Sequence, residues 1–553
     1  MNIDISQIGY RWKGIYSPNL AYADNDVVYK DGGAYVIRNG APVAFALGQQ
    51  DAIMRGHLLT GGLSAGGFGN MVLHTDGATV EFRYQDTRPG TRATKLFYSR
   101  QPGASTGSHY SGQAIMQDRS VRAWGNQNLG ALGMGDVDIG RTSPGKVPFP
   151  PGTPHITDIV TCWNDTFYLD AAGGVWHCGN NEYSLGGYGT TTNQPIPRKV
   201  NGNGDLGANT KIVKIVAARG YYDSRSAMFL DDAGRVYATG SASSNKLGLQ
   251  TTSDVTTPTL IPITETVPMK DMFIGAGTAG ATWLLSTTGQ LYAAGDYLSS
   301  GLAGDTDIPV HRLWMPWGED KPVKSVVFNE TDQHWVTGSQ YIQMTTLVLE
   351  NGDVYMWGDS GAQVGGGWGT GYVGAVQADD SALHPYKVNE GVKQAHSYNG
   401  GYHRSLCLMD DGTIQHSGYA GTEIAPGPVT TWTTIWPEEL KNGTDLFMVG
   451  AQYASQAGLL RSDGTLVLWG DCNNGRAGVG ITDGDSPASN GPVMLDRTIV
   501  DFQPMGAFTP DSTTGAWAML TSDGGVYVTG SAYFGMNGDD DNEHSAVPRQ
   551  IIF

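Results

Sequence analysis

Short apolar segments alternate with glycine-rich turns along most of this chain. A segment that ends in glycine recurs in closely similar form, as GGVWHCG at 173–179, GRVYATG at 234–240, GDVYMWG at 352–358 and GGVYVTG at 524–530. Successive residues of a strand point to opposite faces of a sheet, and β-branched and aromatic residues favour strands. The segment therefore predicts a short strand whose alternating side chains pack, on one side, against a neighbouring sheet.

The closing glycine marks eight copies of this unit. The glycines are Gly125, Gly179, Gly240, Gly295, Gly358, Gly418, Gly470 and Gly530. By subtraction, the intervals between them are 54, 61, 55, 63, 60, 52 and 60 residues. An interval that varies so little indicates stacked supersecondary units.

Each copy contains further strand signals in a constant order. An apolar opening strand, as at 211–218 and 323–328, is followed by a second strand, as at 227–230 and 406–409. A turn of Asp, Asn and Gly then leads to the third strand, because these residues accept the positive φ of a tight hairpin. A loop of the N-x-x-x-x-L-G type and a Pro-containing aliphatic strand close the unit. Three or four short strands cannot bury both faces alone, so we expect an all-β chain in which the units stack radially into a β-propeller.

This pattern resembles the repeat of the regulator-of-chromosome-condensation propeller family. The resemblance covers residues 105–553 and rests on the second strand, the D-G turn, the V-Y-x-W-G strand and the L-G loop. It implies a propeller of usually seven blades whose ring is closed by mixing terminal strands. Eight copies predict eight blades, with seven as the alternative if one copy is absorbed into the closure. The sixth copy departs most, because its segment at 413–427 lacks the L-G loop.

The resemblance does not carry the activity of the family with it. Its name-giving members exchange nucleotide on a small GTPase and sit on chromatin, whereas the residues that match here are turn glycines and core aliphatics. The chain has 34 basic and 53 acidic side chains and a net charge of −19, so nucleic acid should be repelled. We therefore predict no nucleic-acid partner and no nucleotide exchange.

Composition limits the remaining classes of function. The chain is 40% hydrophobic and 16% charged, as expected for a folded protein. Its four cysteines lack a C-x-x-C pair, which predicts buried thiols rather than a zinc site or a disulfide framework. The first 30 residues contain no apolar signal-peptide core, and no stretch is long and apolar enough for a membrane span. We expect neither secretion by a signal peptide nor membrane insertion.

The N-terminal 100 residues follow a different pattern. We expect a small aromatic β module at 1–47 and a Gly-rich linking or docking segment with some strands at 48–104. The layout W-x-G-x-Y…Y-x-x-x-D-x-V-x-Y-x-G-x-x-Y resembles small modules at the ends of bacteriophage tail and fibre proteins, and is similar to chitin-binding modules of bacterial chitinases. The module contributes five candidate ligand contacts: Trp12, Tyr16, Tyr22, Tyr29 and Tyr35. These rings could stack on sugars or could form the core of the module.

Other chemical motifs are weak. The string G-x-S-x-G at 62–66 lacks the strand, helix and α/β context of a nucleophile elbow. Acidic clusters at 304–307, 483–485 and 538–543 lack the spacing of a twelve-residue calcium loop and are interpreted as solvated turns. We predict no catalytic residues, no cofactor and no metal.

Tryptophans outside the repeated frame are the remaining candidates for contacts with a partner. They are Trp314, Trp317, Trp368, Trp432 and Trp436. Aromatic residues of this kind are enriched at interface anchors, but they can equally cover the ends of blades.

These observations favour a bacteriophage virion structural protein, associated with the tail as a fibre, baseplate or nozzle component. The propeller would be a platform for protein–protein or host-surface contacts. Other virion proteins would be its partners, within a homo-oligomer assembled in the host cytoplasm, and a host-surface glycan is a further candidate. The alternatives are a glycan-binding attachment protein or a capsid decoration protein. A polysaccharide-degrading enzyme ranks behind them, because no repeated acid differs from a turn residue.

Overall fold

The computed structural model describes the strands and many of the loops between them. The described residues are 11–15, 26–30, 33–38, 41–44, 69–75, 80–86, 89–98, 111–125, 129–135, 141–162, 164–218, 225–263, 267–275, 280–295, 310–312, 317–318, 321–328, 344–358, 385–399, 403–418, 429–450, 455–482, 485–486, 488–505, 515–531, 538, 544–551 and 553. The chain divides into two compact units, Met1–Arg92 and Ala93–Phe553.

The first unit contains two small sheets. One has four strands in sequence order: β1 (Arg11–Ile15), β2 (Asp26–Lys30), β3 (Gly33–Arg38) and β4 (Ala41–Ala44). Strands β1 and β2 run parallel, and the other pairs are antiparallel. The second sheet is the hairpin of β5 (Gly69–Thr75) and β6 (Val80–Asp86), and a short 3-10 helix at Pro89–Thr91 follows it.

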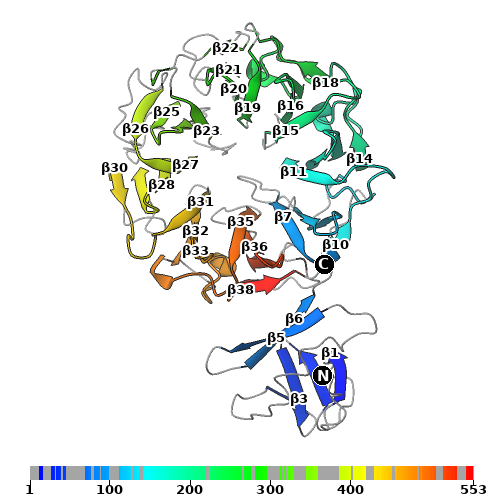
Figure 1. Cartoon of the computed structure of the whole chain (residues 1–553), viewed down its shortest axis with the longest axis vertical. Coiled ribbons are helices and arrows are strands. Elements are labelled where there is room, and N and C mark those ends of the chain that lie inside the picture. Colours follow the sequence, from blue (N-terminus) through cyan, green and yellow to red (C-terminus); the bar gives the residue numbers. More distant parts are fainter. Residues whose placement is uncertain are drawn as a thin grey trace, which may run out of the picture. The chain divides into compact units, whose positions relative to one another are not determined.

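The second unit is a ring of eight four-stranded antiparallel sheets (Figure 1). This confirms the predicted all-β propeller with eight blades. In the first four blades the strands are β7 (Ala93–Tyr98), β8 (Ser111–Met116), β9 (Val121–Gly125) and β10 (Arg141–Lys146); β11 (Ile156–Cys162), β12 (Asp165–Asp170), β13 (Val175–Gly179) and β14 (Gln194–Lys199); β15 (Ile212–Ala217), β16 (Ser226–Asp231), β17 (Val236–Gly240) and β18 (Val255–Leu260); and β19 (Met269–Ile274), β20 (Ala281–Ser286), β21 (Leu291–Gly295) and β22 (His311–Arg312).

The last four blades repeat the same order of strands. They are β23 (Val323–Phe328), β24 (Met344–Leu349), β25 (Val354–Gly358) and β26 (Tyr386–Asn389); β27 (Val392–Asn399), β28 (His403–Met409), β29 (Ile414–Gly418) and β30 (Val429–Thr434); β31 (Gly443–Gly450), β32 (Ser455–Arg461), β33 (Leu466–Asp471) and β34 (Asp485–Ser486); and β35 (Ile499–Met505), β36 (Ala516–Thr521), β37 (Val526–Gly530) and β38 (Ser545–Gln550). Short 3-10 helices occupy Glu182–Ser184, Ser243–Asn245, Asn473–Gly475 and Ala488–Asn490.

The ring closes differently from what the family resemblance implies. Every blade takes its four strands from consecutive chain, so no sheet mixes N-terminal and C-terminal strands. The backbone N–H of Ala93 instead donates to the carbonyl of Gly524 in the eighth blade, at 2.8 Å. Val392 donates the same bond to Gly352, and Ile499 to Gly464, between blades that are consecutive in the chain. The joint between the eighth and first blades, which closes the ring, is therefore built like the other joints. Because β7 lies within the segment 48–104, the propeller unit begins at Ala93 rather than at residue 105.

The third strand of each blade is more deeply buried than the sequence predicted. All five residues of β17 are buried, as are all five of β21 and β37. Val236 packs in the joint with the next blade, and its neighbour Tyr237 packs in the joint with the previous blade. Both faces of the strand are therefore covered, and this explains why apolar residues occur at adjacent positions, such as Val236 and Tyr237, rather than only at alternate ones.

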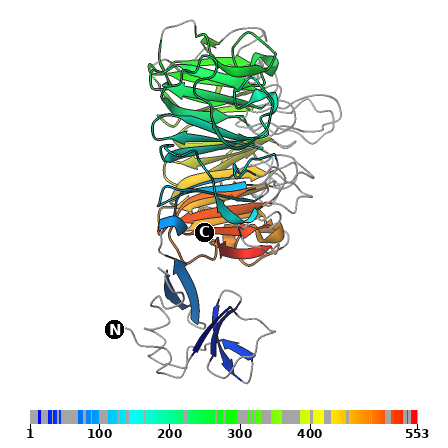
Figure 2. The ribbon, with the colours of Figure 1, turned by 90° about the vertical axis from the view of Figure 1, so that its right-hand side faces the viewer.

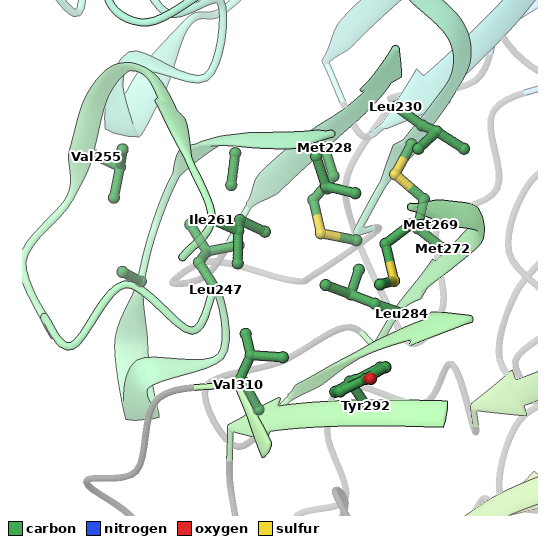
Figure 3. Packing of buried hydrophobic residues seen from close by; sticks show 14 residues of the cluster. Met228, Leu230, Leu247, Val255, Ile261, Met269, Met272, Leu284, Tyr292 and Val310 are labelled. Carbon is green, nitrogen blue, oxygen red and sulfur yellow. The ribbon is translucent and has the colours of Figure 1, made fainter. Parts of the chain in front are cut away.

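The core of the propeller is divided among the joints. The described residues form eight clusters of buried apolar side chains, each between two adjacent blades. Figure 3 shows the cluster between the third and fourth blades, where Met228 and Leu230 of β16 approach Met269 and Met272 of β19. No blade has a closed core of its own, so each depends on its neighbours for stability.

The recurring glycine has a steric cause. Gly179 has a φ of 129° and Gly530 a φ of 109°, in the region that favours glycine. Each ends the third strand opposite the first residue of the second strand, Asp165 and Ala516 respectively. A Cβ on Gly179 would lie 2.1 Å from the carbonyl oxygen of Asn164. The frame therefore repeats glycine because the two strands meet too closely for a side chain.

The L-G-x-G loops join neighbouring blades at the periphery. The N–H of Gly135 donates to the carbonyl of Pro195 in the outermost strand of the next blade, at 2.8 Å. Gly189 makes the same bond to Thr256 and Gly480 to Ala546. The repeated motif thus holds adjacent blades together.

Candidate interaction surface on the inner wall

The first strand of each blade lies on the inside of the ring (Figure 1), and Figure 2 shows the strands running across its thickness. All eight first strands have a register shift between their first and third residues, as between Ala93 and Lys95 in β7. A β-bulge sets two residues against one on the partner strand and redirects the side chains. The eight bulges place equivalent residues at equivalent points of the inner wall.

Burial along these strands separates core positions from wall positions. The first and fourth residues are buried in every blade, as for Ile212 and Ile215 in β15. The fifth residue is half-buried in every blade, and the third is half-buried in seven blades and exposed in the first. Third and fifth positions therefore form the wall.

The third position is polar in all eight blades. From the first blade to the eighth it holds Lys95, Asp158, Lys214, Asp271, Ser325, Gln394, Asp445 and Asp501. Neighbouring blades are linked through these side chains: Lys214 pairs with Asp271, and the Gln394 amide donates to Asp445 Oδ1 at 2.7 Å. In the closing joint, the Gln503 amide donates to the carbonyl of Leu96 at 2.9 Å.

The fifth position adds apolar and aromatic surface. It holds Phe97, Val160, Val216, Phe273, Val327, His396, Phe447 and Gln503. The rings of His396 and Phe447 lie 5.2 Å apart, and the Lys214 ammonium lies 5.2 Å from the centre of the Phe273 ring. A wall with polar and half-buried aromatic side chains can contribute both hydrogen bonds and buried area to a protein contact.

Charge is distributed unevenly around the wall. Burial raises the pKa of Asp158, although Lys95 and Lys214 act in the opposite direction. Burial, together with the neighbouring Asp445 carboxylate, raises the pKa of Asp501 to about 6. Asp445 and Asp501, in the seventh and eighth blades, are here called the acidic arc.

Of the tryptophans outside the frame, Trp317 lies in the core of a joint. Its side chain is 4% exposed and packs between the fourth and fifth blades, with its ring 4.9 Å from that of Tyr355. Trp432 is half-buried against the joint of the fifth and sixth blades, and Trp436 against the next joint. These three side chains cover blade joints, which is the second role considered for them.

The other sequence candidates are less informative. Trp12, Tyr29 and Tyr35 lie on β1, β2 and β3, with Trp12 paired to Val27 and Tyr35 to Val28. Their side chains lie outside the described part of the chain. Four further candidates are wholly outside the described residues: Tyr16, Tyr22, Trp314 and Trp368.

A buried ionic cluster at the joint of the second and third blades has the composition of a catalytic group. His177 Nε2 lies 2.9 Å from Asp165 Oδ1, and Arg225 Nη1 lies 3.2 Å from Asp165 Oδ2. The N–H of Asn181 donates to the same carboxylate at 2.8 Å, and Arg225 also pairs with Glu182. Asp165 and His177 are completely buried, so the cluster fixes the loop after β13 to the start of β16.

The cysteines are structural, as predicted. Cys162, Cys178, Cys407 and Cys472 are all buried, and none of the four is in a disulfide. Burial raises the pKa of Cys178 and of Cys407 to about 12. Within the described ranges, no group of three or more His, Cys, Asp or Glu is arranged to hold a metal. No helix in the described part of the chain is long and apolar enough to cross a membrane.

Sequence reasoning missed the wall residues, although they carried a signal. Each opening strand interrupts its apolar residues with a polar one at the third position, as in ITDIV at 156–160, IVKIV at 212–216 and MKDMF at 269–273. The identity of that residue varies between Lys, Asp, Ser and Gln while its place is constant.

Comparison with known proteins agrees with this architecture. The regulator of chromosome condensation (RCC1) repeat matches residues 233–281, from the D-G turn of the third blade to the start of β20. The chain is a β-propeller that carries the RCC1 repeat. The E3 ubiquitin-protein ligase HERC2 of Homo sapiens is 25% identical over 324 residues, or 58% of this chain, as is that of Mus musculus. The chain spans 6% of the length of these curated relatives.

Two solved structures show the same kind of likeness. Human WBSCR16 is 17% identical and covers 73% of this chain and 100% of its own, with a TM-score of 0.49. Prp20p from Saccharomyces cerevisiae, which binds Gsp1p and histones, is 17% identical and covers 71% of this chain and 89% of its own, with a TM-score of 0.47.

Proposed function

We propose that this RCC1-type propeller is a platform for protein–protein contacts in a bacteriophage virion, associated with the tail. The inner wall carries the first part of the proposal. Its eight equivalent third positions hold Lys, Asp, Ser or Gln, on bulges that fall at the same place in every blade. A recurring backbone with varied side chains that are half-buried or exposed suits the recognition of a partner, and a stable protein contact needs about 1,200–2,000 Å² of total buried surface.

The N-terminal unit supports the virion context. Its aromatic layout resembles modules at the ends of phage tail and fibre proteins, and its strands β1 to β4 form a sheet in a unit distinct from the propeller. Two units in one chain suit a protein that docks on a particle through one and binds a partner through the other.

Mass spectrometry of density-banded phage particles from the source culture tests this function. The proposal expects peptides from both units at a fixed copy number relative to the major capsid protein. A protein that is absent from the particles and free in the lysate would refute the virion role.

Glycan attachment is the second candidate, favoured by the aromatic layout of the β1–β4 sheet. Trp12→Ala should then abolish retention on a column of host-surface polysaccharide, while the thermal unfolding of the chain is unchanged. Equal retention of both proteins would exclude sugar stacking at Trp12.

A further inference from the structure

The second residue of the first strand is the extra residue of each bulge. In the first, second and seventh blades it is a threonine that bonds to its own sheet: Thr94, Thr157 and Thr444 donate to the carbonyls of Ile115, Leu169 and Leu460 at 3.0–3.1 Å. In the third and eighth blades it is valine. The fold therefore accommodates a short, uncharged residue at this position.

Three consecutive blades depart from this rule. The fourth, fifth and sixth blades carry Lys270, Lys324 and Lys393 at the same position, and these lysines are here called the lysine arc. Lys270 and Lys324 are exposed, and Lys393 is half-buried. The Lys324 ammonium donates to the backbone carbonyl of Lys393 at 2.8 Å, so the Lys324 side chain reaches the first strand of the next blade.

Two carboxylates of these blades pair with other cations. Asp271 pairs with Lys214, and Asp353 pairs with Lys321 and Lys387. Of the turns between second and third strands, that of the fourth blade, at 286–289, is the one without an acidic residue. Glu350 and Asp410 lie beside the starts of the fifth and sixth blades, yet among the described residues no carboxylate is paired with Lys270, Lys324 or Lys393.

The lysine arc lies at the edge of the ring that carries the D-G turns. Val392, directly before Lys393, donates its N–H to the carbonyl of Gly352 in the turn of the previous blade. The acidic arc, with Asp445 and Asp501, occupies the next two blades of the wall. An anionic segment is thus attracted to one part of the inner rim and repelled from the other.

From this arrangement we propose that the lysine arc docks an acidic polypeptide segment of a partner protein. The proposal rests on the proposed role as an interaction platform and specifies its surface and the chemistry of its partner. A short acidic segment can pair with three ammonium groups within a limited arc. A nucleic acid would extend its phosphates over the surrounding acidic surface, which disfavours it as the occupant.

Fluorescence anisotropy of a labelled oligoglutamate peptide with the full chain tests the proposal. The test variant is Lys270→Thr/Lys324→Thr/Lys393→Thr, because threonine is the residue that the fold uses at this position. The matched control is Lys146→Thr/Lys199→Thr/Lys441→Thr, which removes three exposed lysines from outside the arc. We expect the arc variant to weaken binding about tenfold or more, the control to stay within about twofold, and the affinity to fall with salt.

Several results would overturn the proposal: no binding of oligoglutamate by the unmodified chain, equal losses in the two variants, or arc-dependent binding of an oligonucleotide but not of the peptide. Thermal unfolding of both variants checks that the fold is kept. The outcome is independent of the particle analysis. If the protein binds the peptide through the lysine arc but is absent from particles, the docking surface stands and the virion role is refuted. If the protein is present in particles but does not bind the peptide, the virion role stands and the docking surface is refuted.

Discussion

The first and third strands of a blade share one sheet but differ in what varies along the sequence. Third strands repeat an aliphatic first residue and a closing glycine from blade to blade, because both of their faces are packed in joints and their glycine meets a neighbouring carbonyl. First strands repeat their backbone, including the bulge, while the side chains at the second, third and fifth positions change. The recurring sequence motif therefore builds the ring, and the variable positions of the wall are available for recognition.

The largest effect should come from removing core volume at a third strand. Leu466 is buried in the joint of the seventh and eighth blades, so Leu466→Ala should lower the free energy of unfolding by about 2–5 kcal/mol. On the wall, Val216 is half-buried, so Val216→Ala should lower the free energy of unfolding by about 1 kcal/mol or less. Chemical denaturation measures both. Equal losses would remove the distinction between the two strands.

The closing glycine should show the next largest effect. Gly179→Ala places a Cβ against the Asn164 carbonyl at positive φ, and should cost about 2–3 kcal/mol. The control is Gly152→Ala: Gly152 also has positive φ, at 85°, but has no atom within 4 Å of a built Cβ. Its cost should be limited to about 1 kcal/mol of backbone strain. If the two variants unfold at the same denaturant concentration, the close approach of the strands is not what selects glycine.

The acidic arc should make stability depend on pH. The pKa of Asp501 is raised to about 6, whereas an unfolded aspartate titrates at about 3.9. The folded state therefore binds the proton more tightly, and stability should fall as pH rises from about 4 to about 6. Asp501→Asn should stabilise the protein by about 1 kcal/mol at neutral pH and leave it unchanged at about pH 4.

The same titration can be sharpened with the neighbouring carboxylate. Asp445→Asn keeps Asp501 but removes the charge that helps to raise its pKa. The pH range over which stability falls should therefore become narrower. A pH profile of unfolding that is identical in all three proteins would show that the acidic arc is screened by solvent.

The smallest effect should be at the ion pair between the third and fourth blades. The side chains of Lys214 and Asp271 are 37% and 29% exposed, so a double-mutant cycle to alanine should give a coupling of about 0.2–1 kcal/mol. The coupling should decrease in about 1 M salt. A larger, salt-independent value would make the wall a structural element like the third strands.

The number of blades followed from the sequence because the joints impose the same steric demand eight times. The closing glycines and the apolar third strands are products of that demand, and their count gave the eight blades directly. The start of the ring was harder to predict, since β7 belongs to a blade whose recognisable frame begins only after residue 105.

The candidate surface was predicted less well, for a related reason. Trp317 was selected because it lies outside the frame, yet a large aromatic side chain can also fill the end of a joint. The wall residues were overlooked because single polar residues within short strands resemble solvated positions. Only the alignment of eight bulges brings Lys95, Asp271 and Asp501 onto one surface.

Crosslinking mass spectrometry of the density-banded particle, with a lysine-reactive reagent, tests most directly whether recognition lies on the inner rim. We expect crosslinks between another virion protein and Lys270, Lys324 or Lys393. Crosslinks to other proteins that arise only from peripheral lysines such as Lys146 and Lys199 would contradict it.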